Sequence, residues 1–90
     1  MPEKRVTVAS KVGLHARPAA LVAKAAAAQP VAVSIAKAGG DPVAARSVLN
    51  LMTLAAGYGD EVVISAEGEG AEAAVTAVAE LVATDLDAAH

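Results

Sequence analysis

With 90 residues, 56% of them hydrophobic, the chain is long enough for one small core, and no linker-like stretch divides it, so we expect a single domain over residues 1–90. The absence of cysteine excludes a disulfide framework and a thiolate metal site, and two histidines are too few for a zinc site. The net charge of −3 and the single aromatic residue argue against nucleic-acid binding, and without a signal sequence or a run of about 20 apolar residues we expect a cytoplasmic protein with no membrane insertion.

The first elements are a strand and a helix. Alternation of apolar and polar residues indicates a strand over Lys4–Ser10, with Val6 and Val8 on one face. Apolar residues then recur with helical spacing from Pro18 onward, and Gln29–Pro30 ends that helix. The helix positions expected to face the core are Pro18, Leu21, Val22, Ala25 and Ala28.

A hairpin is expected next. Val31–Lys37 alternates again, with Val31, Val33 and Ile35 pointing the same way. Gly39–Pro42 is a strong turn signal, and Val43–Arg46 is long enough for a short partner strand.

The last third of the chain predicts a short helix, a strand and a long helix. Ser47 precedes an apolar segment over Val48–Leu54 that reads as a helix capped by the serine hydroxyl and stopped by Gly57. A strand over Asp60–Glu67 and a closing helix over Ala71–Leu86 follow. The positions expected inward are Val62 and Ile64 on the strand and Ala71, Val75, Val78, Val82 and Leu86 on the helix.

This order of elements is strand, helix, strand, strand, helix, strand, helix. Strands with one apolar face need a cover, and three amphipathic helices supply it on one side. The predicted fold class is therefore α+β, an open-faced two-layer sandwich with a four-stranded antiparallel sheet whose other face is in contact with water.

The stretch GLHARPAA, residues 13–20, combines features of a phosphate site. Pro18 suits the first helical turn, where its missing N–H has no intrahelical partner, so His15 falls at or just before the helix N-terminus. Free backbone N–H groups and the positive helix end favour an anion there, and Arg17 adds a fork suited to phosphate oxygens.

The imidazole of His15 distinguishes this stretch from a passive anion site. A neutral ring nitrogen is a nucleophile able to hold a covalent intermediate. Because nearby positive charge disfavours protonation, we expect the pKa of His15 to lie below the usual value of about 6.5.

GLHARPAA resembles the active-site signature of the HPr family, the histidine-containing phosphocarriers of the bacterial sugar phosphotransferase system. A second motif, RSVLNLMTLAAGYGDEV at residues 46–63, resembles the regulatory-serine segment of that family. The resemblance covers nearly the whole chain, and the fold it implies is the open-faced sandwich.

The resemblance implies a carrier and not a stand-alone catalyst. It implies that Nδ1 of His15 accepts a phosphoryl group from enzyme I, charged by phosphoenolpyruvate, and passes it to IIA domains of sugar permeases. Arg17 matches the active-site arginine of the family, and no metal or cofactor is implied.

A docking surface is expected on the short helix. If Val48 and Leu51 face the core, Leu49 and Met52 fall toward its edge as an exposed apolar pair, unless the helix is rotated by one residue. By the resemblance, this helix and the first one dock on partner proteins. The partner-binding candidates are Ala20, Lys24, Val48, Leu49 and Met52. A carrier exposing one face to several partners is expected to be a monomer.

Ser47 has two explanations. Capping of the helix accounts for it without any regulation. The resemblance implies instead that a serine kinase phosphorylates it in some bacteria, where the added negative charge beside the docking surface opposes binding to enzyme I.

Ordinary roles and other functions remain open. His15 could be a capping residue and Arg17 a solvated surface residue. The carrier could serve a regulatory relay, either nitrogen-type or linked to dihydroxyacetone kinase. The chain could instead be a ferredoxin-like binding module, such as a metallochaperone or an RNA binder. The lack of a C-x-x-C motif and of stacking aromatic residues counts against both of these modules. Val12 departs from the polar residue usual in the family, which puts one phosphate contact in doubt.

Overall fold

The computed structural model describes residues 2–9, 16–54 and 56–84. Its elements are the strands β1 (Glu3–Thr7), β2 (Val33–Lys37), β3 (Val43–Ala44) and β4 (Glu61–Ala66) and the helices α1 (Ala16–Ala27), α2 (Val48–Thr53) and α3 (Ala71–Val82). The order β1, α1, β2, β3, α2, β4, α3 is the predicted one. The predicted limits Ser10 and Leu86 lie outside the described residues, and the other limits agree within a few residues.

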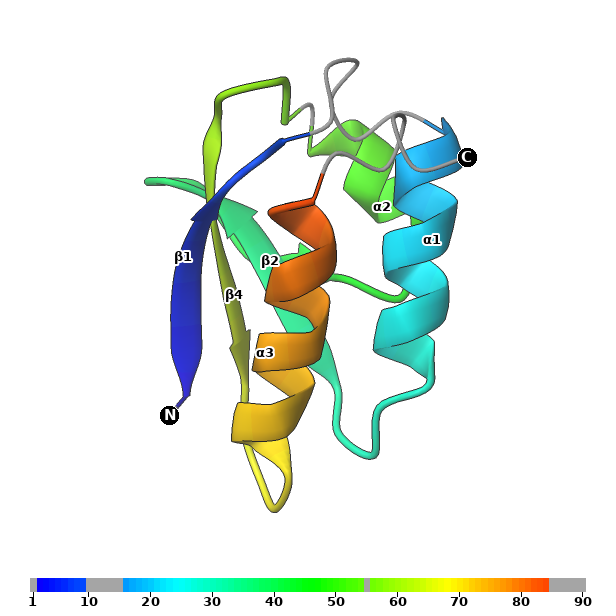
Figure 1. Ribbon diagram of the computed structural model, residues 1–90, viewed down its shortest axis with the longest axis vertical. Coiled ribbons are helices and arrows are strands. Elements are labelled where there is room, and N and C mark those ends of the chain that lie inside the picture. The colour runs from blue at the N-terminus through cyan, green and yellow to red at the C-terminus, as the bar shows by residue number, and fades with distance from the viewer. Residues whose placement is uncertain (1, 10–15, 55, 85–90) are drawn as a thin grey trace.

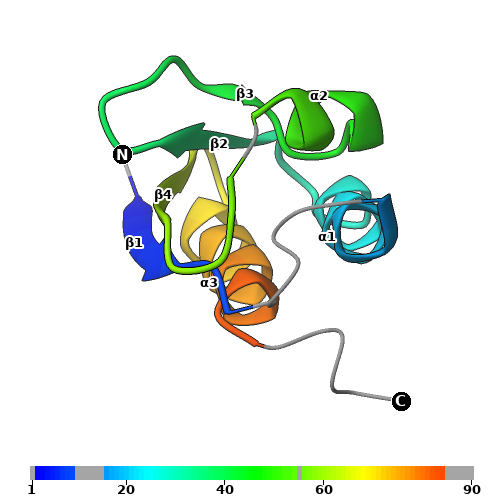
Figure 2. The same cartoon turned by 90° about the horizontal axis from the view of Figure 1, so that it is seen from above.

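The four strands form one antiparallel sheet in the order β1-β4-β2-β3. Val6 lies opposite Val62, and Ile35 opposite Ile64, so these residues share the face toward the helices. Helices α1 and α3 lie on this side (Figure 1), whereas α2 packs beside α1 and close to β3 (Figure 2). The open-faced α+β sandwich is thereby confirmed.

The core is made of thin aliphatic side chains. Its largest fully buried members come from every layer and include Val8, Val22, Ile35, Leu51, Ile64, Val75 and Val78. The opposite face of the sheet carries Arg5, Ser34 and Ser65, which remain partly or fully exposed. This face also carries Ala36 and Val63, so it mixes polar and apolar residues, whereas the face toward the helices holds the core.

Two predictions about buried positions are wrong. On α1 the buried residues are Pro18, Ala19, Val22, Ala23 and Ala26, whereas Leu21 and Ala28, expected in the core, are exposed. The cause is the alanine content of α1, since the small side chains of Ala19, Ala23 and Ala26 let the helix pack closely and turn Leu21 outward. Val48, also expected to face the core, is 37% exposed because it occupies the first position of α2.

Among the described residues, none of the helices combines the length and the apolar character that a membrane span requires.

Candidate functional site

The predicted nucleophile, His15, and the departure at Val12 lie outside the described residues. The structure does describe both flanks of this segment, Ala9 on one side and the start of α1 on the other. The role and the lowered pKa of His15 therefore remain predictions.

The strand-side flank is held by backbone hydrogen bonds. The Val8 N–H donates to the carbonyl oxygen of Asp60 at 2.9 Å, and the Gly59 N–H donates to the carbonyl oxygen of Val8 at 3.0 Å. The Ala9 N–H donates to the carbonyl oxygen of Val82, the last residue of α3, at 3.2 Å. Both the turn before β4 and the end of α3 thus fix the chain where it leaves β1.

The helix-side flank carries a positive charge, and among the described residues no acidic side chain pairs with it. Pro18 is buried in the first turn of α1, as the sequence predicted, while Arg17 is exposed beside it. The first turn contains no acidic residue, and the ion pairs among the described residues, Arg5–Glu61 and Lys37–Asp60, do not involve Arg17. The positive end of α1 and the exposed guanidinium both favour an anion at this place.

Exposed apolar side chains gather on the two neighbouring helices. Leu49 is 70% and Met52 43% exposed on α2, as predicted, and Leu21 is 44% exposed on α1, where the sequence gave no sign of it. Helices α1 and α2 pack against each other (Figure 2). We call the following set the apolar patch: Ala20, Leu21, Val48, Leu49 and Met52, with Lys24 exposed at its border. Such clusters on small proteins mark interaction sites.

The charged residues in the sequence segments that contain α1 and α2 are all positive. Over residues 16–36 and 43–54 the charged side chains are Arg17, Lys24 and Arg46, whereas residues 57–84 carry only acidic ones. A partner that covers the patch should therefore present an acidic rim around an apolar centre.

Ser47 caps α2 in the way the sequence predicted. Its backbone is extended, with φ −100° and ψ 114°, and its Oγ accepts a hydrogen bond of 3.2 Å from the Asn50 N–H. The residue is half-buried and directly precedes Val48 of the apolar patch. Capping explains the serine, while its phosphorylation stays a prediction.

The turn at residues 57–60 is a feature that the sequence analysis missed. Asp60 Oδ2 accepts a hydrogen bond of 2.9 Å from the Gly57 N–H and lies 3.6 Å from Lys37 Nζ. The Gly57 N–H, and then the Lys37 ammonium, lower the pKa of Asp60 below its usual value of 3.8, although partial burial opposes them. Two glycines followed by an aspartate were the available signal for this turn.

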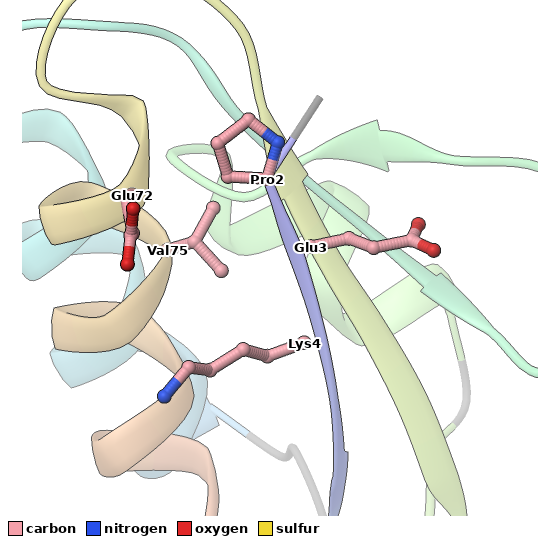
Figure 3. A pocket seen from close by; sticks show the side chains of 5 residues that line it. All are labelled: Pro2, Glu3, Lys4, Glu72 and Val75. Carbon is pink, nitrogen blue, oxygen red and sulfur yellow. The ribbon is translucent and has the colours of Figure 1, made fainter.

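Two pockets lie at opposite ends of β1. One is lined by residues at the end of β1 and in the turn before β4, among them Val8, Ala9 and Gly59. The other, of about 350 Å³, is lined by Pro2, Glu3, Lys4, Glu72 and Val75, near the start of β1 and of α3 (Figure 3). Lys4 points toward α3 in this view, whereas Glu3 points away. Among the described residues no three His, Cys, Asp or Glu side chains form a group that could hold a metal.

Comparison with known proteins places these features in a family. Residues 2–84 match the family model of the PTS HPr component phosphorylation site. The chain is 49% identical over 87 residues to the phosphocarrier protein HPr of Streptomyces coelicolor, covering 97% of this chain and 94% of that protein. It is 36% identical to the phosphocarrier protein NPr of Shewanella violacea, again over 87 residues, 97% of this chain and 94% of that protein.

A solved structure agrees with the sequence comparison. The crystal structure of HPr from Thermoanaerobacter tengcongensis superposes with a TM-score of 0.87 at 33% identity, covering 97% of both chains. The shared fold and the shared sequence therefore extend over nearly the whole length.

Proposed function

This chain belongs to the PTS HPr family of phosphocarriers, and we propose that it accepts a phosphoryl group on Nδ1 of His15 from phosphorylated enzyme I and passes it to IIA domains of sugar permeases. The observation that carries the proposal is the family match over residues 2–84, which includes His15 within GLHARPAA.

The transfer is a nucleophilic displacement at phosphorus. The neutral imidazole nitrogen attacks, a nitrogen–phosphorus bond forms, and the bond from phosphorus to enzyme I breaks; the reverse sequence delivers the group to a IIA domain. Arg17 and the free N–H groups at the start of α1 stabilise the charged oxygens during both steps.

The proposed carrier must also protect the phosphoryl group from water. Residues 10–23 contain no aspartate or glutamate, so the sequence around His15 offers no general base to activate water. An exposed guanidinium holds the phosphate oxygens without assisting hydrolysis, which suits a carrier better than a hydrolase.

Partner binding is assigned to the apolar patch. Enzyme I and the IIA domains would cover Leu49 and Met52 with apolar side chains and face Arg17, Lys24 and Arg46 with acidic ones. The carrier would act as a monomer in the cytoplasm, because each partner in turn needs the same face.

Phosphorylation of Ser47 by a serine kinase would oppose this docking. A phosphate there adds negative charge next to Val48 and partly neutralises the basic surroundings of the patch. Docking on enzyme I would weaken without any change at His15.

The experiment follows the phosphoryl group through the relay. The protein, charged with phosphoenolpyruvate and enzyme I, is mixed with a sugar-specific IIA domain, and phosphorylation of each protein is followed by mass. Transfer to the sugar IIA domain is expected, while transfer only to a nitrogen-type IIA domain would support the regulatory alternative. The identity of 49% to an HPr supports the sugar branch.

A patch variant tests the docking assignment. Leu49→Ala should raise the KM for phosphorylated enzyme I by about tenfold, as expected for an interface side chain contributing about 1.4 kcal/mol. Glu80→Ala, on the exposed side of α3, is the matched control and should leave the KM unchanged. An equal effect of the two variants would contradict the assignment.

A further inference from the structure

The turn at residues 57–60 holds the end of β1, from which the chain runs to His15. We propose that Asp60 is a positioning residue for phosphoryl transfer, acting through this turn on the strand-side flank of the nucleophile segment. The inference rests on the proposed function of His15 and adds a residue to its machinery.

Asp60 closes the turn from both its side chain and its backbone. Its Oδ2 accepts from the Gly57 N–H at 2.9 Å, and its own N–H donates to the Gly57 carbonyl oxygen at 3.0 Å. Gly59, between them, has a φ of +87°, a conformation that side-chain-bearing residues rarely adopt. Lys37 Nζ, 3.6 Å from the carboxylate, ties the turn to the end of β2. The carboxylate thus supplies one of the two hydrogen bonds that close the turn and its ion pair with β2.

The turn also holds the backbone of Val8, the residue that follows β1. The Gly59 N–H donates to the Val8 carbonyl oxygen, and the Val8 N–H donates to the Asp60 carbonyl oxygen. Both backbone groups of Val8 are therefore bound to the turn, and its side chain is fully buried in the core. Figure 2 shows the segment between α2 and β4 lying beside the end of β1. Val8 precedes His15 by seven positions in the sequence.

The placement of a nucleophile affects the rate of phosphoryl transfer more than it affects the affinity of the carrier for its partner. A misplacement of about 1 Å can lower the rate of a positioned reaction by about 100-fold. The residues of the apolar patch lie on α1 and α2, not on the turn. Loosening the turn should therefore slow transfer within the docked complex and leave docking itself unchanged.

Three variants separate positioning from charge and from general destabilisation. Asp60→Ala removes the bond to the Gly57 N–H, whereas Asp60→Asn keeps an oxygen that can accept it. Asp41→Ala, an exposed acidic position between β2 and β3, changes the net charge by the same amount and serves as control. Phosphorylated enzyme I is the donor in every case.

We expect Asp60→Ala to lower the saturating transfer rate about tenfold with the KM within about twofold, because a partly loosened flank costs part of the alignment. Asp60→Asn should recover most of the rate, and Asp41→Ala should behave as the unaltered protein. A folded Asp60→Ala variant that transfers at the normal rate, or whose loss lies wholly in the KM, would overturn the proposal.

Amide hydrogen exchange supplies a readout independent of transfer. In Asp60→Ala the amides of Val8 and Gly59 should exchange faster, while amides in the middle of β4 keep their protection. Unchanged exchange at both amides would also overturn the proposal. If the unaltered protein accepts no phosphoryl group, both the proposed function and this proposal are wrong. If the unaltered protein accepts the group and Asp60→Ala transfers it at the normal rate, only this proposal is wrong.

Discussion

Replacing Ser47 with alanine separates the structural role of this residue from its proposed regulatory one. The Ser47 Oγ accepts from the Asn50 N–H at 3.2 Å and is the side-chain cap of a six-residue helix. Loss of a serine cap costs about 0.5–2 kcal/mol, and because Asn50 is half-buried and water can replace part of the bond, we expect about 1 kcal/mol. For a domain of this size that corresponds to a fall in Tm of about 4–8 °C.

The companion variant is Ser47→Asp, which keeps an oxygen acceptor at the cap and places a negative charge at the positive end of α2. Its stability should equal or slightly exceed that of the unaltered protein, by about 0.3–1 kcal/mol. Its KM for phosphorylated enzyme I should nevertheless rise, because the charge opposes the basic surroundings of the apolar patch.

Urea unfolding measures the first effect, and enzyme I kinetics measure the second. Ser47→Ala should lose stability with a nearly unchanged KM, and Ser47→Asp should show the opposite combination. A Ser47→Ala protein as stable as the unaltered one would refute the capping argument, and an unchanged KM in Ser47→Asp would refute the regulatory one.

Three further predictions concern Leu51 in the core, Asp60 in the turn and Arg17 at the start of α1. Leu51→Ala, at the fully buried position of α2, should cost about 2–5 kcal/mol in urea unfolding, and a loss under 1 kcal/mol would show that α2 contributes little to the core. Because the pKa of Asp60 is lowered, the ionised carboxylate stabilises the folded state above pH 3.8, and this stabilisation is lost as the pH falls through the folded-state pKa. Asp60→Asn should therefore flatten the acid limb of a curve of unfolding free energy against pH. An unaltered acid limb would contradict this. Arg17→Gln should slow phosphoryl acceptance at saturating donor by about 10²-fold, as loss of a charge-stabilising donor does elsewhere, without altering the Tm; a normal rate would remove Arg17 from the site.

Much of the fold was predictable because alternation and turn chemistry act locally. The order of elements, the antiparallel pairing of β2 with β3 and the Ser47 cap all follow from residues close together in sequence. Helical spacing predicted the exposure of Leu49 and Met52 on the condition that Val48 and Leu51 face the core, and only Leu51 does so.

The remaining features depend on contacts that sequence spacing does not specify. In an alanine-rich helix several faces look equally apolar, and only the packing of α1 on its neighbours decides that Leu21 points outward. The Asp60 turn brings together Val8, Lys37 and Gly57 from three distant parts of the chain. The bonds between Asp60 and Gly57 are local, whereas the hydrogen bonds to Val8 and the ion pair with Lys37 form only once β1, β2 and β4 are paired.

The most direct test of the account is phosphorylation with phosphoenolpyruvate and enzyme I, followed by intact mass and an acid-lability test, with His15→Ala as control. The account predicts one acid-labile phosphoryl group on the unaltered protein and none on the variant. No adduct on the folded protein with active enzyme I, or an adduct that persists in His15→Ala, would contradict it.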